Sequence, residues 1–276
     1  MDTLTTDRIA GLAVRRTGTG EPVLALHGSG GGLHTFAPLA RALPDFEVWR
    51  CARRGYPPSP DARGTRTFVQ EVHDVHDLLA TIRAVTESDV HLVGVGYGAS
   101  LALHTALAEP AGIRSLTVIE PPLLLVGPHL PGVLTRYRGL VADRDFRAAA
   151  DLFAREVSLT PEPVLAALST LADPDPVAAA REAVGWTHDL EALAADEVDT
   201  TRWSVLADLD LPILLAQGER SRPPLPAGMD ALAAALPHAR RVVWEDRSSV
   251  TGGVAGAPEL VAASLREFFR VLPQSS

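Results

Sequence analysis

The sequence predicts an α/β fold in which a mostly parallel sheet is flanked by helices and carries an inserted helical cap. Short apolar segments typical of buried strands alternate with longer segments of helical periodicity. This alternation stops after residue 122, and strand character returns only at residue 212. The intervening Ala-, Leu- and Arg-rich sequence is broken by prolines, as in a set of short helices. We therefore expect a core of residues 1–122 and 206–276 and a cap of residues 123–205.

The expected elements follow one another in a regular order along the chain. Residues 8–16 alternate between apolar and polar side chains, which predicts an edge strand. The further segments predicted as strands are 23–26, 46–51, 90–95, 115–119, 212–215 and 241–244. The segments predicted as core helices are 35–42, 68–85, 99–110, 229–235 and 257–271. Strands that alternate with helices favour parallel pairing, with helices on both faces of the sheet.

Composition limits the function classes that the chain can serve. With 276 residues and 46% hydrophobic content, the chain can bury one large core. The formal net charge of −9 argues against nucleic acid or an anionic membrane as a partner. No apolar run approaches the ~20 residues of a spanning helix, and the N-terminus lacks the apolar region of a secretory signal. We expect a cytoplasmic monomer or homodimer whose partner is a small-molecule substrate.

Two absent or rare residue types restrict the chemistry further. Cys51 is the only cysteine, which excludes an internal disulfide and a cysteine-based metal site. The chain has no lysine, which excludes Schiff-base chemistry and the lysine of a phosphate-binding loop. We expect neither a cofactor nor a metal ion.

The glycine-rich stretch at residues 90–100 fits two different motifs. Gly94, Gly96 and Ala99 match the G-x-G-x-x-G/A fingerprint of dinucleotide-binding folds, in which Glu120 at the end of the next strand would bind a ribose. Gly94 and Gly98 match the G-x-S-x-G nucleophile elbow, although Gly96 stands where that motif has its serine. Two strand–helix units precede the stretch, whereas the dinucleotide fingerprint normally opens its domain.

The order of several motifs resembles the α/β-hydrolase superfamily. They comprise His27-Gly28 after the first core strand, Arg53-Arg54-Gly55 with Ser59 after the second, HLVGVGYGAS at 91–100, GERS at 218–221 and the terminal helix APELVAASLREFF at 257–269. The insertion after the sixth strand also fits. The resemblance implies an α/β-hydrolase fold over about 250 residues and, in intact members, acyl transfer through a serine, a histidine and an acid.

The resemblance also implies that the catalytic triad is degenerate. The serine position is occupied by Gly96, which has no nucleophilic atom, and the histidine position falls at about Ser249. The usual acid position, in 218–221, ends in Ser221, with Glu219 nearby. Without a nucleophile and its base, ester or amide hydrolysis through an acyl-enzyme is not expected.

The anion-binding part of such a site is retained in the sequence. The backbone N–H of Tyr97, at a helix N-terminus, and an N–H of Ser29 or Gly30, next to Gly28, would converge on one point. This oxyanion hole would stabilise an enolate as well as a tetrahedral intermediate. The glycine at position 96 also enlarges the space beside it.

Four side chains are candidates for proton transfer, each with an ordinary structural alternative. Glu120 is a relocated acid or a pocket wall, and the Tyr97 phenol contacts substrate or packs under the cap. His34 faces the pocket mouth or solvent, and His188 lies over the site or on a solvated cap surface. By position, Ser221 and Ser249 would border the pocket as well.

These features predict an enzyme recruited to non-hydrolytic chemistry on a small organic molecule. Cyclisation, C–C or C–O bond formation, or a lyase or isomerase step on a polyketide-like secondary metabolite would use the oxyanion hole and the cap. One alternative is a catalytically inactive protein that binds a small molecule in the same pocket. A second alternative is a dinucleotide-dependent oxidoreductase.

Overall fold

The computed structural model describes residues 6–61, 64–160, 162, 165–166, 175–197, 199, 201–247 and 256–271. Its strands are β1 (Asp7–Ile9), β2 (Leu12–Thr17), β3 (Pro22–Leu26), β4 (Glu47–Cys51), β5 (Val90–Val95), β6 (Ile113–Ile119), β7 (Ile213–Gly218) and β8 (Arg240–Trp244). They form one eight-stranded sheet in the order β1-β2-β4-β3-β5-β6-β7-β8. β2 is antiparallel to β1 and β4, and every other pair is parallel, which confirms the expected mostly parallel sheet.

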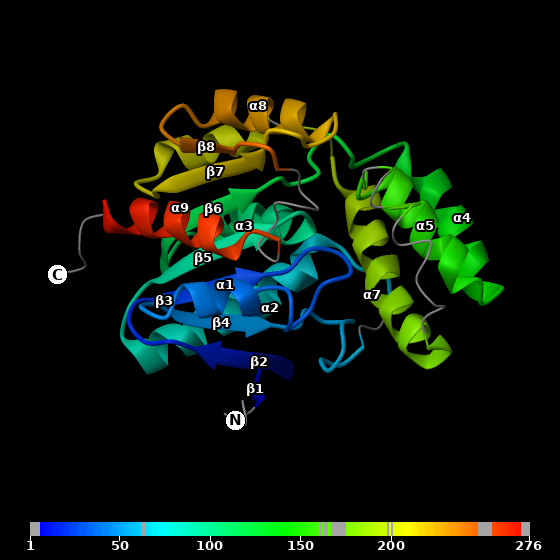
Figure 1. Ribbon diagram of the computed structural model, residues 1–276, viewed down its shortest axis with the longest axis horizontal. Helices are drawn as coiled ribbons and strands as arrows, with labels where there is room; N and C mark the ends of the chain where they lie inside the picture. The colour runs from blue at the N-terminus through cyan, green and yellow to red at the C-terminus, as the bar shows by residue number, and fades with distance from the viewer. Residues whose placement is uncertain are drawn as a thin grey trace.

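Helices cover both faces of this sheet (Figure 1). α1 (Ala37–Ala42) and α9 (Pro258–Arg270) share one hydrophobic cluster with the sheet, and α2 (Phe68–Thr86), α3 (Tyr97–Ala108) and α8 (Leu225–Ala235) share another. α2 begins where the sequence predicts, because Thr67 and Gln70 form a capping box that satisfies its first amides. The edge strand predicted at 8–16 is divided into β1 and β2 by a turn at Ala10-Gly11, where both residues have positive φ.

The insertion between β6 and β7 is helical and lies at the carboxyl ends of the parallel strands, on the right of Figure 1. It contains α4 (Leu130–Ala142), α5 (Phe146–Glu156) and α7 (Pro176–Ala195). Aspartates cap two of these helices: Asp145 accepts from Ala148 N at 3.0 Å, and Asp175 accepts from Ala178 N at 2.8 Å. The 3-10 helix η1 (Thr201–Asp208) packs against α3 and α8, on the core side of the insertion.

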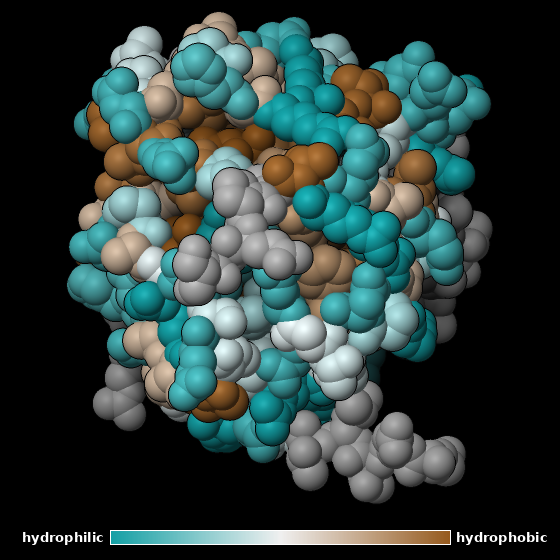
Figure 2. Space-filling view, turned by 90° about the vertical axis from the view of Figure 1, so that its left-hand side faces the viewer, coloured by the Kyte–Doolittle hydropathy of each residue, from teal (hydrophilic) through white to brown (hydrophobic). Residues whose placement is uncertain are grey.

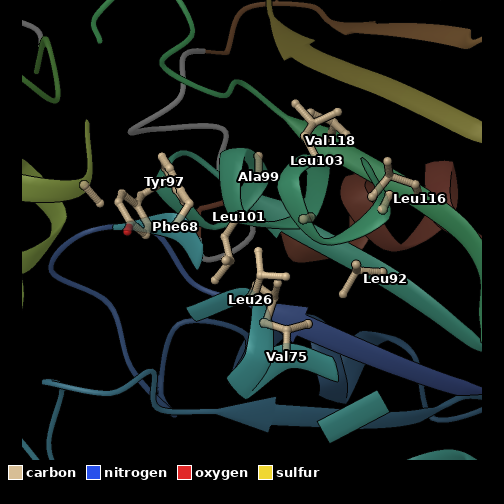
Figure 3. Close-up of a cluster of buried hydrophobic side chains, with 14 of the residues drawn as sticks. Leu26, Phe68, Val75, Leu92, Tyr97, Ala99, Leu101, Leu103, Leu116 and Val118 are labelled. Atoms are coloured by element: carbon tan, nitrogen blue, oxygen red, sulfur yellow. The ribbon is translucent and has the colours of Figure 1, made fainter. Parts of the chain in front are cut away.

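The larger hydrophobic cluster fixes α3 against the sheet (Figure 3). Leu26, Leu92 and Leu116 come from three adjacent strands, and Leu101 and Leu103 come from α3. Each fully buried side chain of this kind contributes about 1.5–3 kcal/mol. The position of the first turn of α3, where the candidate site begins, is therefore set by the core.

The two ends of the sheet differ in what covers them. Ligands of open α/β sheets bind beyond the carboxyl ends of the strands, which here is the end that the cap covers. Figure 2 shows the side away from the cap, where hydrophilic residues predominate and hydrophobic ones gather toward the upper left. Among the residues that the structure describes, no helix is both long and apolar enough to cross a membrane.

Candidate active site

A cavity of about 280 Å³ lies between the cap and the carboxyl ends of the central strands. The core lines it with the glycine loop after β3, with Val95, Gly96 and Tyr97 after β5, and with Glu120 and Pro122 after β6. The cap and α8 add further apolar residues to the wall, namely Phe153, Val157, Leu193 and Leu225. The cavity therefore combines an apolar wall with a few polar groups, as small-molecule sites do.

The three glycines of the elbow have different structural reasons. A Cβ atom at Gly94 would lie 2.2 Å from the Gly98 oxygen, and one at Gly98 would lie 2.2 Å from the Leu26 oxygen. These two glycines are needed because the helix packs directly on the strands. Gly96 has φ 55° and ψ −123°, a backbone conformation that residues other than glycine rarely adopt. A Cβ atom at this position would nevertheless have no atom nearer than 4.0 Å. The elbow is thus fully formed, with open space where a nucleophile would project.

Tyr97 and Ser29, two residues whose amides are expected to form an oxyanion hole, both line the cavity. Tyr97 is the first residue of α3, so its N–H has no partner within the helix. The glycine loop is adjacent, since a Cβ at Gly28 would lie 3.8 Å from Tyr97 N. Burial, followed by the nearby Asp189 carboxylate, raises the pKa of the Tyr56 phenol well above its usual value, and a hydrogen bond from the Gly30 N–H to the phenol oxygen opposes this by a smaller amount. Since the Gly30 N–H is engaged by Tyr56, Ser29 is the candidate for the second amide at the cavity.

Glu120 is the only carboxylate among the described residues that line the cavity. It is 3% exposed and has φ 48°, an unfavourable conformation for a glutamate, and such strain concentrates at functional sites. Its Oε1 accepts from Gly218 N at 2.7 Å and from the Ser221 hydroxyl. Ser221 does not line the cavity as expected, and its hydroxyl instead holds the Glu120 carboxylate in place. The segment that holds the acid in intact members therefore orients Glu120.

The structure corrects the expected positions of the two histidines. Neither His34 nor His188 lines the cavity of Gly96. His34 borders a second cavity of about 270 Å³, on the other side of the glycine loop, together with Arg181 and Glu182. His188 Nδ1 lies 3.2 Å from Glu191 Oε2 on the same helix. α7 turns His188 toward the loop at residues 53–56, and Leu193, further along the helix, is the residue that faces the cavity.

The Tyr97 side chain points into the core. Its phenol donates to Glu71 Oε1 at 2.6 Å, and its ring stacks on Phe68 with centroids 4.9 Å apart, as Figure 3 shows. Burial, followed by the nearby Glu71 carboxylate, raises the phenol pKa well above its usual value. The phenol is therefore engaged in the core and does not face the cavity as a substrate-contacting group would. Ser249 lies outside the described residues.

A buried ionic cluster beside the elbow was not expected from the sequence. Arg53 pairs with Glu71 at 2.8 Å and with Asp189 at 2.8 Å, and all three side chains are at most 3% exposed. One signal was present for Glu71, which falls among the apolar positions of α2 that repeat at helical spacing. No local pattern marks Asp189, because its partners lie more than 100 residues away. The structure describes no group of three or more His, Cys, Asp or Glu residues that could hold a metal ion.

Comparison with known proteins agrees with this architecture. The profile of the alpha/beta hydrolase fold family matches residues 21–247. A pimeloyl-[acyl-carrier protein] methyl ester esterase of Xanthomonas campestris is 30% identical over 267 residues, which cover 93% of this chain and 98% of that protein.

Solved structures give the same result. An alpha/beta hydrolase from Sphaerobacter thermophilus matches with a TM-score of 0.73 and 26% identity, over 96% of this chain and 100% of the other. An enol-lactonase from Burkholderia xenovorans matches with a TM-score of 0.71 and 20% identity, over the same shares of the two chains. These matches favour the interpretation of the glycine stretch at β5 as a nucleophile elbow over that as a dinucleotide fingerprint.

Proposed function

Since the chain belongs to the α/β-hydrolase fold family, we propose that it is an enzyme that acts on a small, largely apolar carbonyl compound without an acyl-enzyme. The observation that carries this proposal is Gly96. It keeps the elbow conformation and lines the cavity, but it offers no atom that could attack a carbonyl carbon. The dinucleotide-dependent alternative is set aside, because the family accounts for the same glycines.

The remaining groups support proton transfer next to a stabilised oxyanion. The substrate carbonyl oxygen would accept hydrogen bonds from the N–H groups of Ser29 and Tyr97, which strengthen as negative charge develops. Glu120 would remove a proton from the adjacent carbon or from a hydroxyl group. The resulting enolate or alkoxide could then cyclise, isomerise, or form or break a C–C or C–O bond. Phe153, Val157 and Leu193 would hold the substrate and exclude water.

The position of Glu120 favours a catalytic step over simple binding. Glu120 occupies a strained, hydrogen-bonded position on the wall of the cavity, which a passive binding pocket does not require. A polyketide-like substrate stays a prediction.

A second candidate is hydrolysis by a directly activated water molecule. The names of the esterase and the enol-lactonase among the similar proteins favour this possibility. The open space beside Gly96 could seat a water molecule, and Glu120 could act as its general base. Both candidates use the same oxyanion hole and differ in what attacks or loses a proton.

One experiment separates these possibilities. The protein is incubated in D2O with a panel of ketones, β-dicarbonyl compounds, esters and lactones, and each mixture is followed by NMR. The proposal predicts deuterium incorporation or rearrangement without release of an acid, reduced about 100-fold or more in Glu120→Gln. The matched control is Glu245→Gln, because Glu245 is exposed and does not line the cavity.

The other outcomes identify the alternatives. Release of an acid that depends on Glu120 would favour the hydrolytic candidate. Ligand binding without any turnover, or turnover that Glu120→Gln does not change, would overturn the proposal.

A further inference from the structure

The two residues whose amides are expected to form the oxyanion hole are also connected through their side chains. The Ser29 hydroxyl donates to Asp189 Oδ2 at 2.6 Å, and the Tyr97 hydroxyl donates to Glu71 Oε1 at 2.6 Å. Arg53 bridges the two carboxylates: Nη1 donates to Glu71 at 2.8 Å and to Asp189 at 2.9 Å, and Nη2 donates to Asp189 at 2.8 Å. An unbroken chain of hydrogen bonds thus runs from the half-buried Ser29 through the buried Arg53 to Tyr97.

We propose that Arg53, Glu71 and Asp189 are positioning residues that fix the Ser29 and Tyr97 amides relative to each other. Asp189 belongs to the cap, so it also makes the geometry of the oxyanion hole depend on the seating of the cap. This inference rests on the proposed function, because it assumes that the two amides bind an oxyanion.

Arg53 makes further contacts that fix its position. Its Nε donates to the His27 oxygen at 3.0 Å, and its backbone N–H donates to His27 Nε2 at 3.0 Å. Its guanidinium lies over the rings of Tyr56 and Tyr97, at 4.7 and 4.3 Å from their centroids. Because removal of one partner would leave a buried charge uncompensated, the cluster is expected to move only as a unit.

The cap completes this arrangement through α7. Asp189 Oδ2 accepts from the hydroxyl groups of both Ser29 and Tyr56, the latter at 2.6 Å. Three residues earlier on the same helix, Trp186 lies against Gly30, where an added Cβ would come within 2.9 Å of the indole ring. When α7 is displaced, the glycine loop loses both contacts. The cap therefore contributes two of the contacts that hold the loop of the second amide donor in place.

The charge of the cluster separates a positional role from an electrostatic one. Glu71 and Asp189 share the single guanidinium of Arg53, so the cluster carries an excess of negative charge. The Asp189 carboxylate thus adds negative charge near the proposed oxyanion hole. Through its charge alone, Asp189 would weaken anion binding, and Asp189→Asn would strengthen it. Through its position, Asp189 strengthens anion binding, and Asp189→Asn weakens it. The two roles therefore predict opposite signs.

The first measurement uses 4-nitrophenolate as the probe, because its absorption reports binding of the anion to the cavity. The wild-type protein is compared with Asp189→Asn and Ser29→Ala, the latter of which keeps every charge. We expect about tenfold weaker binding in each variant, the effect of losing one charge-assisted hydrogen bond. The control is Ser204→Ala, since Ser204 is exposed and does not line the cavity. Tighter or unchanged binding in Asp189→Asn would overturn the inference.

The second measurement does not depend on the probe. Hydrogen exchange is measured for peptides that cover residues 27–33 and 97–101 in folded wild-type protein and in Asp189→Asn. We expect at least about fivefold faster exchange in the glycine loop of the variant. The control is Asp196→Asn, because Asp196 is a cap carboxylate that pairs with Arg202, away from this loop. Equal exchange in wild type and Asp189→Asn, or equal effects of the two variants, would contradict the positional link.

The two measurements also separate this inference from the proposed function. If wild-type protein does not bind 4-nitrophenolate, the oxyanion hole of the proposed function fails. In that case the exchange of the glycine loop still decides whether Asp189 holds Ser29 in place.

Discussion

Arg53 and Asp189 are 136 residues apart in the chain, yet they form a two-point ion pair with N–O distances of 2.9 and 2.8 Å. This pair ties the cap helix α7 to the loop that follows β4, directly beside the elbow. It is buried on both sides, with side chains 3% and 1% exposed. The cap is therefore anchored at the site itself, and not only at its connections to the sheet.

Loss of this anchor should destabilise the protein. Asp189→Ala would leave the Arg53 guanidinium with Glu71 as its remaining carboxylate partner, and we expect the free energy of unfolding to fall by about 3 kcal/mol. Urea unfolding of the variant and of Asp151→Ala, an exposed cap aspartate, would measure the difference. A loss as small as that of the control would show that the pair contributes little.

The vacant nucleophile position should accept a serine. Gly96→Ser places its Cβ in open space, so only the strained φ opposes it, at a cost of about 1–3 kcal/mol. Gly98→Ser would instead drive a Cβ to 2.2 Å from the Leu26 oxygen and should not fold. Thermal unfolding of the two variants checks this contrast. Equal stability of both would mean that the elbow is not packed as described.

The wild-type protein should not react with serine-directed fluorophosphonates. Gly96 has no hydroxyl, and the hydroxyls of Ser29, which lines the cavity, and of Ser221, which contacts Glu120, both donate to carboxylates. Intact-protein mass spectrometry after incubation with the reagent measures the adduct. Stoichiometric labelling would reveal a nucleophile that the proposed mechanism does not contain.

His91 should make stability depend on pH. It is fully buried, with its ring stacked 3.9 Å from that of Phe269, and burial, followed by the charge of Arg114, lowers its pKa from 6.5 to about 3. The folded state therefore binds a proton less readily than the unfolded state does. The contribution of His91 is fully present above about pH 6.5 and is lost as the pH falls toward 3, by about 1.4 kcal/mol per pH unit.

Unfolding at a series of pH values tests this dependence. His91→Gln keeps a hydrogen-bonding group near Ser115 and should flatten the pH profile between about 6 and 4. His238→Gln is the control, because His238 is exposed. Glu21, whose carboxylate lies 3.5 Å from His91 Nε2, is the opposing charge at this position. An unchanged slope in His91→Gln would assign the pH dependence to other groups.

The features that the sequence predicted correctly are mainly local. The alternation of strands and helices and the glycine elbow depend on neighbouring residues, so their pattern survives without knowledge of distant contacts. The cavity position of Glu120 also followed from its place after a core strand. The role of Ser221 was predicted differently, because its contact with Glu120 spans 101 residues.

The positions of His34 and His188 show why the rest could not be predicted. Each lies within a few residues of a segment that lines the cavity, but spacing alone does not fix the direction of its side chain. For His188 this direction depends on how α7 packs on the core, and the Arg53–Asp189 pair, which no local periodicity connects, is part of that contact. Sequence spacing could place these histidines near the site but could not show on which side of the glycine loop they lie.

Binding of an anion by the amides of Ser29 and Tyr97 can be observed directly in solution. 15N-labelled protein is titrated with 4-nitrophenolate and, as a neutral control, with 4-nitroanisole, and the Ser29 and Tyr97 amide resonances are followed. We expect 4-nitrophenolate to shift both resonances downfield and both shifts to saturate with one affinity, while the neutral analogue leaves them nearly unchanged. Binding that moves other amides but not these two would show that the two amides do not form an oxyanion hole.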